Sequence, residues 1–207
     1  MGCDIHLYTE KLIEWDNKKF WWCIDYFQLN EYKLLDDELS GWNHISIYND
    51  RDYDLFAALA DVRNYGYVTP ICQPRGLPDD VSKAVKIKSD EWGIDGHSHS
   101  WLTAKELFDY QKKYSTTKQS GMISLEQAKE LDENGIVPSS WCQYTTNKNY
   151  TYRSWVRQES PVDKLVEAVK AKIKEEFHIY DFYDKEKQEK QIMEHAEELR
   201  IVFFFDN

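Results

Sequence analysis

The stretch GHSHSWLT carries two histidines one residue apart, with a serine after each of them. His97 and His99 would lie on one face of the chain if this segment is extended, because side chains alternate along a strand. Imidazole is the side chain best suited to proton transfer near neutral pH, and it is also a common metal ligand. The segment is therefore a candidate catalytic or binding site.

Asp4 and His6 form a second candidate pair at the start of the chain. A strand would place both side chains on one face, about 7 Å apart. A carboxylate beside an imidazole orients the ring and raises its basicity, and Asp206 near the other end of the sequence is a further carboxylate for this role. The alternative interpretation is an ordinary solvent-exposed strand face.

Thr103 and Glu106 have the spacing of a capping box, which predicts a helix over residues 104–113. The free N–H groups of its first turn would point toward residues 97–102, where a phosphate fits and where Ser98 and Ser100 add donors. Alternatively, Ser100 and Thr103 only satisfy the helix end. That alternative does not explain the two histidines.

Arg75 lies in the stretch QPRGLPDD, where Gly76 permits a positive φ and two prolines stiffen the chain. A rigidly held guanidinium suits bidentate recognition of a phosphate. The alternative is a structural turn in which Arg75 pairs with Asp79 or Asp80. Arg63, at the end of an expected helix, is a similar candidate, and Trp101 is a candidate for stacking on a base.

Two histidines in an H-x-H pattern form half of a metal site, which Asp4, His6, Asp95 or Asp206 would have to complete. No third ligand follows at a regular spacing. We therefore predict no cofactor, with a divalent metal as the alternative.

Several segments have the periodicity of strands or helices and would position these residues. Residues 2–8 alternate, with Cys3, Ile5 and Leu7 on one side, and a turn at WDNKK leads to a second strand, so a hairpin is expected. Residues 114–120 are polar and predict a surface loop. Helices are expected within 53–66 with a stop at Gly66, near 80–86, over 104–113, over 125–134 after the cap Ser124, after the cap Ser160 with Pro161 at the first position, and over 184–198.

The first strand and the terminal stretch RIVFFFDN are both strongly hydrophobic, so we expect them side by side in one sheet. The fold class predicted is α+β, with a mixed, mainly antiparallel sheet that includes both terminal strands and is flanked by helices. Residues 1–207 would form a single domain, with about 110–198 as a candidate helical subdomain.

Composition and charge limit the classes of function. The chain has 207 residues, 42% of them hydrophobic, and a net charge of −11, which argues against binding duplex nucleic acid. Four scattered cysteines, the lack of a signal peptide at the start and the absence of a long apolar run predict a cytoplasmic protein with no membrane partner. A small anionic ligand remains compatible, because charges are screened over about 10 Å.

Five blocks together resemble a family of bacteriophage-encoded proteins: MGCDIHLYTE, YDLFAALADVRN, PICQPRGLP, GHSHSWLTAKEL and RIVFFFDN. The blocks extend from the first residue to the last, with 110–198 less distinctive. The resemblance implies a phage origin and the cytoplasm of an infected host cell, and it brings no reaction with it. By analogy of type, phage proteins of this character counter nucleotide-based host immunity.

Three hypotheses of function follow. The first is a protein that sequesters a small phosphate-bearing nucleotide, of the cyclic-nucleotide or ADP-ribose type, for which a homo-oligomer would be suitable. Its ligand-binding residues would be Asp4, His6, Arg63, Arg75, His97, Ser98, Ser100, Trp101 and Asp206. The second is a phosphodiesterase in which His6 and either His97 or His99 act as general acid and base. The third is an inhibitor of a host protein that acts through its acidic surface.

Overall fold

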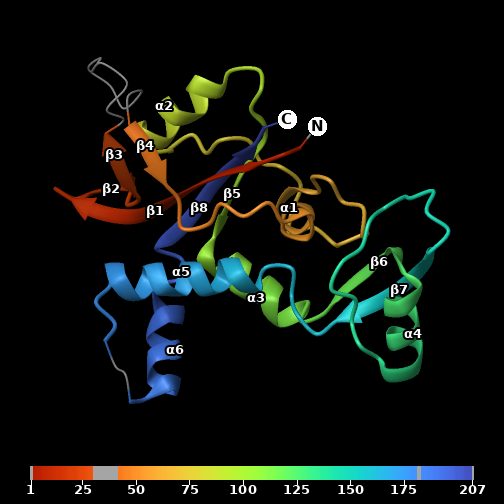
Figure 1. Cartoon of the computed structure of the whole chain (residues 1–207). Helices are drawn as coiled ribbons and strands as arrows, with labels where there is room; N and C mark the ends of the chain where they lie inside the picture. Colours follow the sequence, from red (N-terminus) through yellow and green to blue (C-terminus); the bar gives the residue numbers. More distant parts are fainter. Residues whose placement is uncertain (1, 30–41, 181–182, 207) are drawn as a thin grey trace.

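The computed structural model describes residues 2–29, 42–180 and 183–206 (Figure 1). The described strands are β1 (Ile5–Trp15), β2 (Lys18–Cys23), β3 (Tyr26–Leu29), β4 (Trp42–Ile45), β5 (His97–Thr103), β6 (Thr117–Ser124), β7 (Tyr150–Arg157) and β8 (Leu199–Phe205). The helices are α1 (Tyr53–Ala60), α2 (Lys83–Trp92), α3 (Ala104–Lys113), α4 (Leu125–Asn134), α5 (Asp163–Glu176) and α6 (Lys185–Glu194). None of the helices in these ranges is long and apolar enough to cross a membrane.

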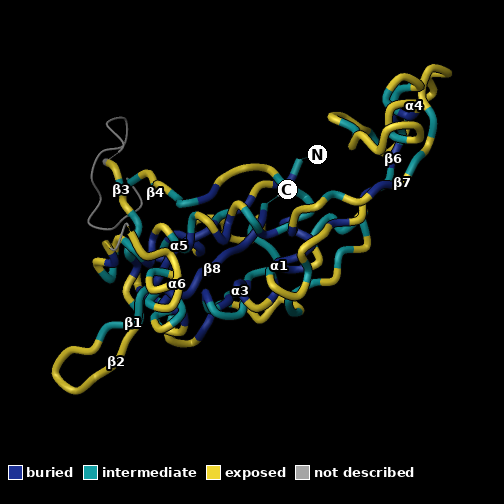
Figure 2. The backbone as a smooth tube through the Cα atoms, turned by 90° about the horizontal axis from the view of Figure 1, so that it is seen from below, coloured by how far each residue is buried: buried dark blue, intermediate teal, exposed yellow. Residues whose placement is uncertain are grey.

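The central element is a four-stranded antiparallel sheet with the strand order β2-β1-β8-β5. The N-terminal strand β1 pairs with the C-terminal strand β8, with His6 opposite Phe204 and Leu7 opposite Phe203. Every residue of β8 is buried, as the dark tube in the middle of Figure 2 shows. The α+β class and the pairing of the terminal strands are therefore as expected from the sequence.

Both faces of this sheet are covered, and buried apolar residues of β1 and β8 lie on each side of it. Cys3, Ile5 and Leu7 pack on one face with residues of α1, α3 and α5. Tyr8 and Phe204 pack on the other face with Val85 of α2 and the loop around Leu77 and Val81. The sheet thus has a helical layer on one side and a thinner layer on the other.

A buried ion pair attaches the loop before α2 to the sheet. Arg200, 2% exposed, donates from Nε to Glu10 at 2.7 Å, and Glu10 also accepts from the backbone N–H of Ser82. The guanidinium continues to Asp80 at 2.7 Å and lies 4.2 Å from the ring centre of Trp21. Each charge has partners on several sides, as a buried ion pair requires.

Local signals placed most elements correctly, and several boundaries differ. Asp16 and Asn17 both have positive φ in the two-residue turn between β1 and β2. The helix expected to stop at Gly66 ends at Ala60, because Asp61 takes the left-handed capping conformation. The helix expected near 80–86 is α2, which begins at Lys83 and is longer. The helix expected at Ser160 begins at Asp163, whose carboxylate accepts from the Ser160 N–H.

Residues 114–120 were expected to form a surface loop, and this prediction is wrong from Thr117 onward. Thr117 begins β6, which pairs with β7 over eight residues and carries α4 on the connection between them. We call residues 117–157 the hairpin unit; Figures 1 and 2 show it projecting from the rest of the molecule. The stretch 110–198 thus contains a two-stranded sheet as well as helices, and its status as a subdomain stays a prediction.

The hairpin unit is joined to α1 by a chain of hydrogen bonds between buried polar groups. Trp155 Nε1 donates to the side-chain oxygen of Gln119 at 3.1 Å, and the Gln119 amide donates to Asp54. Burial raises the pKa of Asp54, against the opposing effect of the hydrogen bond from Gln119. These contacts bring β6 against the first turn of α1.

Candidate functional site

Side chains suited to catalysis or to ligand binding gather at two places in the described part of the chain. The first is the terminal histidine cluster, which we define as His6, His99, Trp92, Phe204 and Asp206. The Nε2 atom of His6 lies 3.2 Å from a carboxylate oxygen of Asp206. These two candidate residues come from opposite ends of the sequence and are in contact in the structure. The other Asp206 oxygen accepts from the Asp4 backbone N–H at 3.0 Å.

His6 and His99 share one phenylalanine. Their ring centres each lie 4.9 Å from the ring centre of Phe204, and Trp92 lies 4.2 Å from His6. His99 Nε2 is 3.0 Å from the Ser89 hydroxyl. Burial, followed by the nearby His97, lowers the pKa of His99. Burial therefore favours the neutral form of His99, in which one ring nitrogen carries no proton.

His97 does not lie on the same face as His99. A bulge between His97 and Ser100, with Ser98 at a φ of 52°, places His97 opposite Phe205 rather than Phe204. Side chains of neighbouring residues on β8 leave opposite faces of the sheet. The shared face expected for an extended segment is thus lost, because the bulge inserts one residue. His97 Nδ1 lies 3.0 Å from the Ser98 hydroxyl.

Arg75 is held by the protein itself. It forms a bidentate ion pair with Glu106, lies 5.0 Å from the Trp101 ring centre, and donates its backbone N–H to the buried Ser100 hydroxyl. Its partner is therefore not Asp79 or Asp80, which the alternative interpretation as a structural turn had named. Glu106 belongs to the capping box of α3, as predicted from Thr103.

The Glu106 side chain also lies at the N-terminus of α3, the position where the sequence predicts a bound phosphate. The Glu106 carboxylate accepts from the Thr103 backbone N–H, so the chain's own anion occupies the position expected for a ligand. Burial disfavours the charged form, but the bonds from Arg75 and Thr103 outweigh it and lower the pKa of Glu106. A phosphate at Arg75 would have to displace this carboxylate.

Two further candidate residues, Asp4 and Arg63, each have partners within the protein. Asp4 accepts two hydrogen bonds from Arg51, at 2.8 and 2.7 Å. Arg63 bonds to Tyr65 and to the Cys3 thiol, whose pKa is nevertheless raised by burial. Within the described ranges no group of three or more His, Cys, Asp or Glu side chains is arranged to hold a metal ion.

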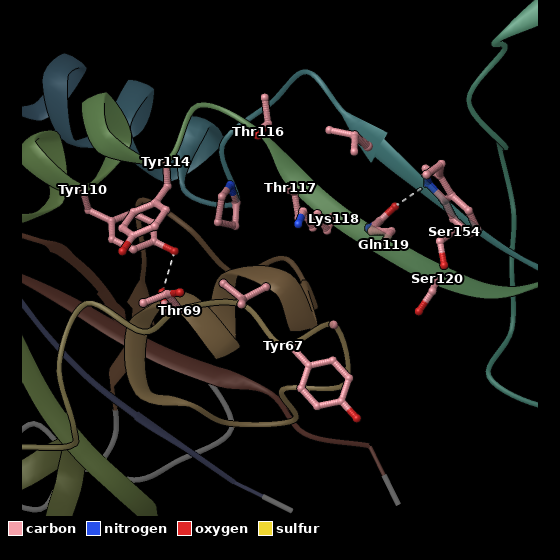
Figure 3. A pocket seen from close by; sticks show the side chains of 15 residues that line it. Tyr67, Thr69, Tyr110, Tyr114, Thr116, Thr117, Lys118, Gln119, Ser120 and Ser154 are labelled. Carbon is pink, nitrogen blue, oxygen red and sulfur yellow. Dashed lines mark hydrogen bonds between the residues drawn. The ribbon is translucent and has the colours of Figure 1, made fainter.

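The second place is a cavity of about 750 Å³ between the hairpin unit and the loop after α1, which we call the junction cleft (Figure 3). Tyr110 and Tyr114 lie at one end, with ring centres 4.6 Å apart, and Ser120 and Ser154 lie toward the other. Tyr110 donates its hydroxyl to the Thr69 carbonyl, and burial raises its pKa to about 12. This end of the cleft is therefore lined by two aromatic rings, one of which is held by a hydrogen bond.

Tyr67 lies on the loop after α1, across the cleft from β6 (Figure 3), and it combines high exposure with an unusual backbone conformation. Its side chain is 93% exposed, yet its backbone has a φ of 55°. A bulky residue in this conformation costs about 1–3 kcal/mol, and such strain concentrates at ligand-binding sites. Packing does not explain a tyrosine here, because the ring is almost fully in solvent.

Lys118 supplies a positive charge to the same cleft. It is exposed on β6 between the buried Thr117 and Gln119, and it has no ion pair among the described residues. A cation next to several hydroxyl groups suits an anion. The cleft therefore offers aromatic rings, hydrogen-bonding groups and one lysine to the same ligand.

Sequence reasoning did not identify the junction cleft. The available signals were two tyrosines around Gly66 in a loop and the polar alternation that begins at Thr117, inside the segment 114–120 that the sequence predicts as a loop. It also missed His44, whose Nε2 lies 2.7 Å from Asp25 and whose ring stacks on Tyr8.

Comparisons with models of protein families, with curated proteins and with solved structures gave no match to this chain.

Proposed function

We propose that this chain binds and sequesters a small phosphate-bearing nucleotide, of the cyclic-nucleotide or ADP-ribose type, in the junction cleft. The exposed, left-handed Tyr67 at the rim is the observation that carries the proposal. A base would stack on this ring, and Lys118 would take the phosphate. The resemblance to phage-encoded proteins favours a role against a host nucleotide signal in the infected cell's cytoplasm.

Sequestration suits the chemistry of the cleft. The tyrosines, hydroxyl groups and single lysine that line it can recognise a nucleotide, and no histidine is among the lining residues. The site differs from the one expected from sequence, because Arg75, Ser100 and Trp101 are engaged with one another and with Glu106. Of the predicted ligand-binding residues, Arg63 is the one that lines the neighbouring cavity.

A panel of cyclic dinucleotides and ADP-ribose derivatives tests the proposal through the melting temperature of the purified protein. At least one nucleotide should raise it and be recovered intact after heat denaturation. Tyr67→Gly should weaken binding by about 1–3 kcal/mol, or roughly 5- to 150-fold, because the stacking surface is lost. The same change should not lower the stability of the free protein, since glycine relieves the strained backbone.

Tyr144→Gly is the matched control, because Tyr144 is also highly exposed but does not line the cleft. Tyr67→Phe should keep most of the affinity. The proposal fails if no nucleotide raises the melting temperature, or if Tyr67→Gly and Lys118→Gln bind like the wild type. An acidic surface acting on a host protein would then become the better hypothesis.

The second candidate is a phosphodiesterase, favoured by the contact between His6 and Asp206 and by the neutral His99 on the same Phe204 ring. His99 would accept a proton from the attacking group, and His6 would donate one to the leaving oxygen. New products in the heat-denatured sample, lost in His6→Asn, would support this candidate over sequestration.

A further inference from the structure

A second cavity of about 180 Å³ adjoins the junction cleft. Arg63, Tyr65, Gln143 and Tyr152 contribute to its walls. Both cavities are lined in addition by Gly66, Gln119 and Ser120. These three residues border both, so the two cavities are adjacent, and we treat them together as one groove.

The groove runs between β6 and the loop over residues 61–69. Along β6 the lining residues pass from Thr117 and Lys118 in the first cavity to Gly121 in the second. A strand rises about 3.3 Å per residue, so Lys118 and Gly121 are separated by about 10 Å. One phosphate group cannot span this length.

The same pair of side-chain types occurs in each half of the groove. Tyr67 and Lys118 line the first cavity, and Tyr65 and Arg63 line the second. An aromatic ring beside a cation provides a stacking surface for a base and a partner for a phosphate. The repetition points to a ligand with two such units.

The loop is held in the shape that displays these residues. The Asn64 side chain donates to Asp61 and to the Val68 carbonyl, and it accepts from the Val68 N–H at 2.8 Å. Arg63 and Tyr67 both have positive φ, 51° and 55°. The left-handed Asp61 caps α1, but no helix end accounts for the other two. A loop fixed before binding loses less entropy when the ligand arrives.

We infer that the groove binds a ligand of two nucleotide units, with one base and one phosphate in each cavity. This inference rests on the proposed function and specifies its ligand class. A linear dinucleotide should therefore bind more tightly than a mononucleotide, and Arg63 should account for the difference.

Titration calorimetry with AMP and with the linear dinucleotide pApA tests this on the full chain. For the wild type we expect pApA to bind at least tenfold more tightly than AMP. In Arg63→Gln this ratio should fall to within threefold, while Arg63→Lys should keep part of it because the charge remains. Arg153→Gln, which removes an arginine paired with Asp132 on the hairpin unit, is the control and should leave the ratio at its wild-type value.

The outcomes distinguish a failure of the two-unit ligand from a failure of nucleotide binding itself. Binding of AMP and pApA with equal affinity would overturn the two-unit ligand and leave nucleotide binding in the junction cleft intact. An unchanged ratio in a folded Arg63→Gln would also overturn it. If neither probe nor the wider panel binds, the proposed function itself fails.

Discussion

Positive φ angles at non-glycine residues mark several positions where the backbone departs from its preferred conformations. Asp16 and Asn17 form the hairpin turn, and Asp61 caps a helix, so local structure explains these three. Ser98 lies in the bulge that places His97 and His99 on different faces of the sheet. Arg63 and Tyr67 lack such an explanation and line the groove, which is why our proposed binding site is placed around them.

His99 provides a prediction of pH dependence. Its pKa is lowered from an ordinary value of 6.5 by burial and then by His97, so the folded state resists its protonation. A histidine with a lowered folded pKa costs stability as the pH falls through its unfolded value. Between pH 7.5 and 5, the urea midpoint of the wild type should fall further than that of His99→Gln.

The exposed His178 supplies the control substitution, since its ring contacts Tyr180, which is not part of the histidine cluster. Glu106 also has a shifted pKa, but that pKa is lowered from 4.5, so its loss of stability appears below the window used for His99. Equal pH dependence in the wild type and in His99→Gln would contradict the assignment.

At the scale of elements, β6 shows how a polar segment can form a strand. Its buried positions alternate along Thr117, Gln119, Gly121 and Ile123, and two of the four are polar. The Thr117 hydroxyl donates to the Glu159 carbonyl, and Gln119 bonds to Asp54 and Trp155. These partners satisfy the buried polar groups, so burial does not require apolar residues there.

Gly121 allows Trp141 to lie against β6. A Cβ atom at Gly121 would come within 2.6 Å of the Trp141 ring and 3.0 Å of the Cys142 carbonyl. Gly121→Ala should therefore destabilise the hairpin unit by about 1–3 kcal/mol, as overpacking does. Hydrogen exchange of the β6 and β7 amides measures the effect.

Gly66→Ala is the matched control for this substitution. The nearest atom to a Cβ there is 3.5 Å away, an ordinary contact, and the backbone φ is not positive. Similar losses in both variants would show that the space beside Trp141 does not explain the glycine at 121.

At the scale of the whole molecule, the central sheet and the hairpin unit differ in how they are stabilised. The sheet has a large apolar core on one face and a smaller one on the other. The hairpin unit has its own small cluster around Ile123, Ala128 and Trp155. Polar contacts through Gln119 join the unit to α1, and the junction cleft lies beside this joint.

Gln119→Leu tests that joint. It would leave the Trp155 indole N–H and the Asp54 carboxylate without their partner, at a cost of about 1–3 kcal/mol each. Exchange of the hairpin-unit amides should accelerate, while the β8 amides keep their protection. The exposed Gln143→Leu is the control, and an equal loss of protection in β8 would refute a separately stabilised unit.

The sequence by itself determined the α+β class and most helix starts, because alternation and caps are local properties. It also predicted the pairing of the terminal strands, because both are strongly hydrophobic. Arg200, Val202 and Phe204 alternate with Ile201, Phe203 and Phe205 in the structure as they do in the sequence. The capping box of Thr103 and Glu106 likewise needs only four residues.

Only the tertiary structure decided the surroundings of the candidate residues. One bulge placed His97 and His99 on different faces, and Glu106 rather than an aspartate became the partner of Arg75. The junction cleft exists because the loop of Tyr67 and the strand of Lys118, about fifty residues apart, are docked against each other. Periodicity describes which side of an element is buried, whereas a cavity depends on how distant elements are placed, and local sequence patterns do not contain that information.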